Sequence, residues 1–188
     1  MDLREWVDEA ARRRMPSLGH DDAYFLGSGI VGASGTPAGE WTFAIGPDYT
    51  CPNYLHSESV WLNDSGAIPF EMYRLRGCGA FFGLAVVREL RCTITDVCPP
   101  DSCTILRMVT LENEGNRECA CLLRIRIVPD GETVAVGSDG LEIRRDAGEW
   151  CFGNQETHNW APRRMRICVP GAVLAQEDNA YDLQIAVR

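Results

Sequence analysis

The feature that most constrains the fold of this chain is a period-two alternation of apolar and mostly polar residues in the segment 118–128. Successive residues of a β-strand point to opposite faces of a sheet, so this spacing predicts one strand with a core face and a largely solvated face. A helix would instead need apolar residues three and four positions apart. The inward positions of the predicted strand are Cys119, Cys121, Leu123, Ile125 and Ile127.

Short segments with the same period recur after Tyr24, separated by glycine, proline, asparagine and aspartate. Residues 103–111 and 118–128 flank a turn at 113–116, which predicts that these two strands are antiparallel neighbours in a hairpin. A second hairpin is predicted from residues 132–136 and 141–145. The other predicted strands are 25–33, 41–45, 59–63, 68–75, 81–89, 92–97, 163–169 and 181–187.

This series of strands predicts an all-β protein, in which two antiparallel sheets stack as a β-sandwich. Leu3, Trp6, Val7 and Ala10 recur at helical spacing before Pro16, which predicts one short N-terminal helix. No linker, repeat or low-complexity tract divides the 188 residues. We therefore expect a single domain over residues 1–188.

The net charge of −9 and the isoelectric point near 4.8 argue against a nucleic-acid partner, since such affinity comes from cations that displace phosphate counterions. The first residues contain early acidic side chains and no apolar run of signal-peptide length. No stretch approaches the roughly 20 consecutive apolar residues of a membrane span. We expect a cytoplasmic protein that binds neither nucleic acid nor membrane.

Residue types that build metal and catalytic centres are present, but not at a recognisable spacing. None of His20, His56 and His158 has a second histidine at a metal-binding spacing, and the nine cysteines form no Cys-x-x-Cys pair. Cys119 and Cys121 share one face of the predicted strand, which indicates core packing. No serine or cysteine lies in a nucleophile signature. We expect no metal, no cofactor and no catalytic residue.

Residues 26–33, 41–46 and 57–62 read LGSGIVGA, WTFAIG and SESVWL. Together they resemble the opening of several families of glycoside hydrolases and phosphorylases, in which a β-supersandwich precedes an (α/α)6 barrel that carries the catalytic acids. Ser28 stands where those families usually have asparagine. The resemblance implies that this chain is the N-terminal β-sandwich module of a longer protein, and that its partner is the catalytic barrel of that protein.

The segment 150–160 has the composition most typical of a saccharide site. It combines tryptophans, which stack on sugar rings, with amides, a carboxylate and an imidazole, which hydrogen-bond to hydroxyl groups. A polar turn without a ligand explains the same residues, and Trp41 and Trp61 fit either a sugar platform or the core. The predicted substrate-binding residues are Trp150, Asn154, Gln155, Glu156, His158 and Trp160.

Glycoside hydrolysis uses two carboxyl groups at a fixed separation, and sequence spacing does not pair any here. We therefore predict a non-catalytic module of a carbohydrate-active enzyme, with a saccharide as a further partner. Two alternatives stay open: a stand-alone sugar-binding module, and an aldose-epimerase-like enzyme that uses His56 or His158 with Glu156. The acidic candidates are Asp21, Asp22, Glu40, Glu58, Asp64 and Glu71.

Overall fold

The computed structural model describes residues 14–19, 22–46, 53–75, 79–152 and 156–187. Every regular element in these residues is a β-strand and every pairing is antiparallel, so the predicted all-β class is confirmed. The predicted helix over residues 3–10 lies outside the described residues. No helix among the described residues has the length and apolar character to cross a membrane.

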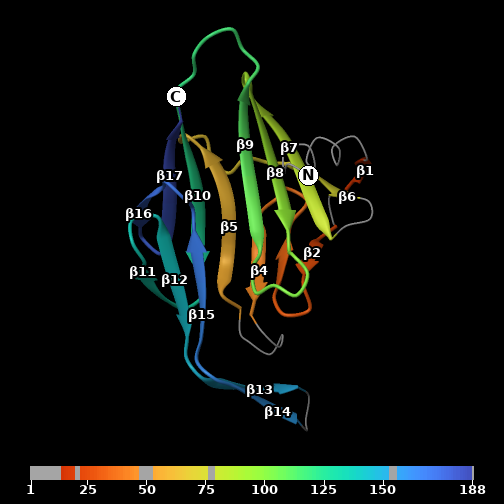
Figure 1. The fold of residues 1–188 in the computed structure, drawn as a ribbon, viewed down its shortest axis with the longest axis vertical. Helices are drawn as coiled ribbons and strands as arrows, with labels where there is room; N and C mark the ends of the chain where they lie inside the picture. The colour runs from red at the N-terminus through yellow and green to blue at the C-terminus, as the bar shows by residue number, and fades with distance from the viewer. Residues whose placement is uncertain (1–13, 20–21, 47–52, 76–78, 153–155, 188) are drawn as a thin grey trace.

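Two large sheets form the body of the molecule (Figure 1). The five-stranded sheet has the order β1-β6-β7-β8-β9, and the seven-stranded sheet has the order β16-β17-β10-β5-β4-β3-β2. The strands of the first sheet are β1 (Arg14–Ser17), β6 (Glu71–Leu75), β7 (Ala80–Val87), β8 (Leu90–Val97) and β9 (Leu106–Asn113). Those of the second are β2 (Tyr24–Gly27), β3 (Gly32–Gly35), β4 (Trp41–Ile45), β5 (Leu55–Leu62), β10 (Cys121–Pro129), β16 (Val173–Glu177) and β17 (Ala180–Val187).

Two smaller sheets complete the described structure. The strands β11 (Glu132–Ala135), β12 (Gly140–Arg145) and β15 (Arg163–Cys168) form a three-stranded sheet, and β11 with β12 is the second predicted hairpin, which is confirmed. The strands β13 (Gly148–Phe152) and β14 (Glu156–Trp160) pair only with each other in the described residues. Figure 1 shows this hairpin at the lower end of the molecule, beyond the ends of β12 and β15.

The main core lies between the two large sheets and follows the predicted alternation. On β10, Leu123, Ile125 and Ile127 are buried, while Arg124 and Arg126 point to the other face. The aromatic rings of Tyr24 on β2 and Phe81 on β7 are 4.6 Å apart, and the apolar cluster contains residues of both sheets. Burial of this apolar surface from both sides holds the sandwich together.

The prediction of core packing is correct for Cys121 and wrong for Cys119. Cys121 is buried, whereas Cys119 is exposed. The strand begins at Cys121, so the residue two positions earlier precedes the sheet and no longer shares its inward face. Alternation therefore predicted the centre of this strand better than its beginning.

The predicted hairpin between residues 103–111 and 118–128 is wrong. The strand β9 pairs only with β8 among the described strands, whereas β10 pairs with β5 and β17 in the other sheet. The connecting segment turns away because Glu114 donates its backbone N–H to the Glu89 carbonyl, and Asn113 bonds to the backbone of Arg117 and Gly115. The chain thus crosses from one sheet to the other at this point.

The predicted single strand over residues 25–33 is a hairpin of β2 and β3. The Ser28 N–H donates to the Val31 carbonyl, and the Ser28 hydroxyl accepts from the N–H groups of Ile30 and Val31. Gly29 has a φ of 87°, a conformation that glycine adopts without a side-chain clash. This turn interrupts the alternation and brings Tyr24 on β2 to the edge of the seven-stranded sheet.

Candidate functional site

Five aromatic and charged side chains from five strands meet between the two large sheets. Glu58 has the same parity on β5 as the buried Val60 and Leu62, so the alternation of the strand directs it into the core. Cross-strand pairing places Glu58 opposite Trp41. The set, which we call the Arg107 cluster, is Tyr24 on β2, Trp41 on β4, Glu58 on β5, Asp96 on β8 and Arg107 on β9.

Arg107 is the centre of the cluster. Its Nε and one terminal nitrogen donate to the two carboxylate oxygens of Asp96, at 2.7 and 2.6 Å. The other terminal nitrogen donates to Glu58 Oε2 at 2.5 Å. The guanidinium carbon lies 4.3 Å from the centre of the Trp41 ring. A planar guanidinium suits both kinds of contact, because its fork matches a carboxylate and its face stacks on an aromatic ring.

Asp96 is fully buried, and fixed donors surround its carboxylate. Besides the two bonds from Arg107, Oδ2 accepts from the Tyr24 hydroxyl at 2.7 Å and from Trp41 Nε1 at 3.1 Å. The Tyr24 oxygen in turn accepts from Arg107 at 3.0 Å. A buried charge is tolerated when it is paired and hydrogen-bonded in this way.

Glu58 is the carboxylate that the cluster compensates least. Burial raises its pKa to about 7; the nearby Arg107 lowers the pKa, and Asp96 and Glu40 raise it further. Burial also raises the pKa of Tyr24, which keeps it a neutral phenol. The cluster contains one cation and two carboxyl groups, so its net charge is −1 when Glu58 is ionised and zero when Glu58 is protonated.

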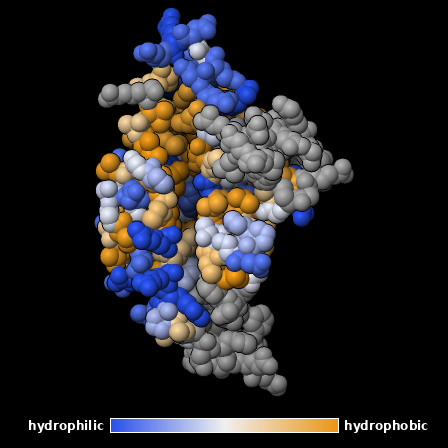
Figure 2. All heavy atoms as spheres, in the orientation of Figure 1, coloured by the Kyte–Doolittle hydropathy of each residue, from blue (hydrophilic) through white to orange (hydrophobic). Residues whose placement is uncertain are grey.

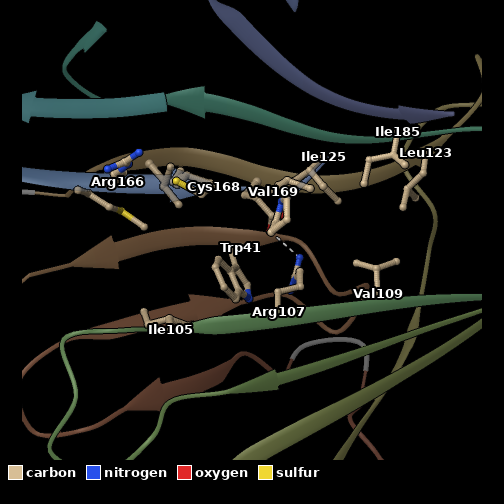
Figure 3. A pocket seen from close by; sticks show the side chains of 15 residues that line it. Trp41, Ile105, Arg107, Val109, Leu123, Ile125, Arg166, Cys168, Val169 and Ile185 are labelled. Carbon is tan, nitrogen blue, oxygen red and sulfur yellow. Dashed lines mark hydrogen bonds and ion pairs between the residues drawn. The ribbon is translucent and has the colours of Figure 1, made fainter. Parts of the chain in front are cut away.

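A pocket of about 330 Å³ opens beside the cluster, between the β9 side and strands β10, β15 and β17 (Figure 3). Glu58 and Arg107 contribute to its lining, and most of the rest is apolar. Ile105 and Val109 lie across the pocket from Ile125 (Figure 3). The inward residues of β9 are only half-buried, so the two large sheets do not close over each other at this strand. Figure 2 shows a hollow in the middle of the face of the molecule that it draws.

The predicted substrate-binding residues fall on the β13–β14 hairpin. Trp150 lies on β13, and Glu156, His158 and Trp160 lie on β14. Asn154 and Gln155 are outside the described residues. The prediction of a loop between two strands was thus wrong in one respect, since most of this segment is itself a pair of strands.

The register of the hairpin brings most of the predicted residues to one face. Trp150 is opposite His158, Phe152 is opposite Glu156, and Gly148 is opposite Trp160. Directly opposite residues of an antiparallel pair share a face, and so do residues two apart on one strand. One face therefore holds the positions of Trp150, Phe152, Glu156, His158 and Trp160.

The remaining sequence candidates are dispersed. Trp41 is buried in the Arg107 cluster, which supports its interpretation as a core residue. His56 is largely exposed and lies 3.8 Å from Asp130, and Asp64 is almost fully exposed. Asp22 and Glu71 are also exposed, Glu40 is half-buried, and Asp21 is outside the described residues. Of the acidic candidates that the structure describes, only Glu58 takes part in the Arg107 cluster.

Asp96 and Arg107 were not predicted from the sequence, although each lies two residues away from apolar residues that point into the core or the pocket. Asp96 follows the buried Cys92 and Ile94 at two-residue steps, and Arg107 lies between the pocket residues Ile105 and Val109. A charged residue in an inward series was the available signal. Alternation marks these residues as inward charges, but it does not say which of them meet, because the partners of Arg107 come from four other strands.

Within the described ranges, no group of three or more histidine, cysteine, aspartate or glutamate side chains is arranged to hold a metal ion. Comparisons with protein-family models, curated proteins and solved structures found no match. We therefore classify the protein from its fold alone. It is an antiparallel β-sandwich with a buried arginine cluster, an inter-sheet pocket and a separate hairpin.

Proposed function

We propose that this chain is a non-catalytic β-sandwich module of a carbohydrate-active enzyme, a glycoside hydrolase or phosphorylase, and that its β13–β14 hairpin contributes a saccharide-binding face. The module packs on the catalytic barrel of the same protein and lends it this hairpin. The observation that carries the proposal is the register that gathers Trp150, Glu156, His158 and Trp160 on one face.

The residue types on this face suit a sugar. Aromatic rings offer apolar surfaces to the C–H faces of a pyranose, while a carboxylate and an imidazole exchange hydrogen bonds with hydroxyl groups. In the described part of the chain the hairpin pairs with neither large sheet, so its backbone is not committed to the sandwich. Arg145 and Arg163 pair where the chain leaves β12 and enters β15, which anchors the base of the hairpin.

The test is a titration of the 188-residue chain with α- and β-linked glucose disaccharides, followed by tryptophan fluorescence and NMR. We expect weak binding, and we expect Trp150→Ala and Trp160→Ala each to raise the Kd about fivefold, because a lost stacking face costs on the order of 1 kcal/mol. Glu149→Gln and Thr157→Ala are matched controls, because their positions lie on the opposite face of the hairpin. Both controls should leave the Kd unchanged.

Equal losses in the tryptophan and control variants would contradict a specific face, and no binding by any disaccharide would remove the saccharide assignment. We also expect no turnover, because no recognisable motif in the sequence fixes an acid–base pair. Hydrolysis of a glycoside or interconversion of anomers well above the uncatalysed rate would instead favour the aldose-epimerase-like alternative. The reading frame beyond Arg188 tests the barrel separately: helical-barrel sequence there supports the module assignment.

A further inference from the structure

The pocket beside the Arg107 cluster combines apolar walls with one carboxyl group whose charge is not balanced. Arg107 and Asp96 form a bidentate pair, so an ionised Glu58 carries the remaining negative charge. The Glu58 side chain is only 4% exposed, yet it belongs to the pocket lining. A charge in such surroundings is costly unless a counter-charge accompanies it.

We propose that this pocket binds a small primary alkylammonium, with its ammonium group on Glu58 and its aliphatic chain against the apolar walls. A monovalent cation brings the charge of the cluster to zero, and an aliphatic chain removes apolar lining from water. The volume of about 330 Å³ is near the lower end of ligand pockets, which run from roughly 300 to 1,000 Å³, so a short unbranched chain fits. This site is separate from the saccharide face of the hairpin.

The charged groups around Glu58 favour a cation on balance. Asp96 on β8 and Glu40 before β4 add negative potential at the carboxyl group, while Arg107 on β9 already bonds to Oε2. Tyr24 stays neutral. The opposing charge is Arg166 on β15, which lines the pocket but is exposed to solvent, where water and salt screen its repulsion.

A proton and an ammonium compete for the same carboxylate. An alkylammonium stays charged across neutral pH, since amines of this kind titrate near 10.4, as lysine does. Glu58, with a pKa of about 7, is mostly protonated below neutral pH. The apparent affinity should therefore fall about tenfold for each pH unit below 7 and level off above it.

The test is to measure the Kd of the full chain for n-hexylammonium, n-hexanol and hexanoate at pH 6 and pH 8, by calorimetric or NMR titration. We expect hexylammonium to bind more tightly than hexanol, with the advantage growing about tenfold between the two pH values. Glu58→Gln should abolish that advantage, and Glu112→Gln, an exposed carboxylate on β9, should not change it. Val109→Phe, which fills the pocket away from the carboxyl group, should weaken binding of every ligand.

Three results would overturn the proposal. Tighter binding of hexanoate than of hexylammonium would mean that the charged residues of the pocket favour an anion. Equal affinity for hexylammonium and hexanol would mean that Glu58 does not attract the ammonium group. Binding unaffected by Val109→Phe would place the ligand elsewhere. This last variant keeps the proposal testable if Glu58→Gln does not fold, because Val109 is outside the hydrogen-bonded cluster.

Discussion

Strand β5 carries an arginine–aromatic cluster on each of its faces, and the two differ in how completely their polar atoms are paired. On the inward face Glu58 joins the Arg107 cluster. On the outward face the guanidinium carbons of Arg124 and Arg126 lie 5.3 and 5.1 Å from the centre of the Trp61 ring. With Asp182 on β17, these residues form what we call the outer cluster.

Both inner carboxylates accept hydrogen bonds, whereas the carboxylate of the outer cluster takes part only in looser ion pairs with its two arginines. Asp182 lies 3.7 and 3.6 Å from the terminal nitrogens of Arg124 and Arg126, and its Oδ1 has no hydrogen-bond partner among the described residues; nor has Arg124 Nε. All oxygens and nitrogens joined around Asp96 are within 3.1 Å. The same residue types therefore form a fully hydrogen-bonded cluster on the inward face of β5 and an incompletely hydrogen-bonded one on its outward face.

The largest expected difference is produced by removing the central arginine. Arg107→Met would leave Asp96 and Glu58 buried without their cation, which costs about 3–5 kcal/mol of unfolding free energy. Arg124→Met should cost less, about 1–2 kcal/mol, because Arg126 stays beside Asp182. Urea unfolding of both variants measures the difference. An equal loss of unfolding free energy in the two variants would contradict the difference between the two clusters.

The stability of the inner cluster should depend on pH, because Glu58 titrates at a different pH in the folded protein than in the unfolded chain. Its pKa is about 7 in the folded protein against an ordinary 4.5, so the folded state binds more protons between these values. The associated stability is present in full below pH 4.5 and is lost as the pH rises to about 7, a change of about 3 kcal/mol. The unfolding free energy of the wild type, relative to Glu58→Gln, should fall by this amount over that window.

Urea titrations at several pH values from 4.5 to 8 measure this difference. Glu112→Gln is the control, since its side chain is 59% exposed and lies outside the cluster. A difference that stays constant with pH would show that Glu58 titrates as it does in water. A difference that increases with pH would show that Arg107 outweighs burial and lowers the pKa.

How far the sequence predicted this fold depends on what alternation can report. Period two identifies a strand and its inward face, and it predicted β4, β8 and the β11–β12 hairpin closely. It does not say which sheet receives a strand, so the pairing of β9 with β10 was predicted wrongly. A turn signal such as that at residues 113–116 is compatible with either a hairpin or a crossing between sheets.

The two candidate sites differ in the same way in how far the sequence could predict them. Composition selected residues of the β13–β14 hairpin as saccharide-binding candidates, because a local cluster of aromatic and polar residues is visible in one segment. Their role in binding stays a prediction. The Arg107 cluster was missed, since Tyr24 and Arg107 are separated by 83 positions and meet only when the two sheets stack. Parity could have marked Glu58, Asp96 and Arg107 as inward charges, and a set of inward charges predicts mutual pairing in a core.

The smallest expected effect lies at the rim of the outer cluster. Arg126 donates to Glu177 at 2.9 Å, but the Glu177 side chain is 65% exposed, so water competes for both charges. Glu177→Gln should therefore cost about 0.5 kcal/mol or less, and added salt should reduce that cost, because exposed ion pairs are screened. Unfolding in urea at low and high salt measures it. A salt-independent cost as large as that of Arg124→Met would mean that the outer cluster is as tightly organised as the inner one.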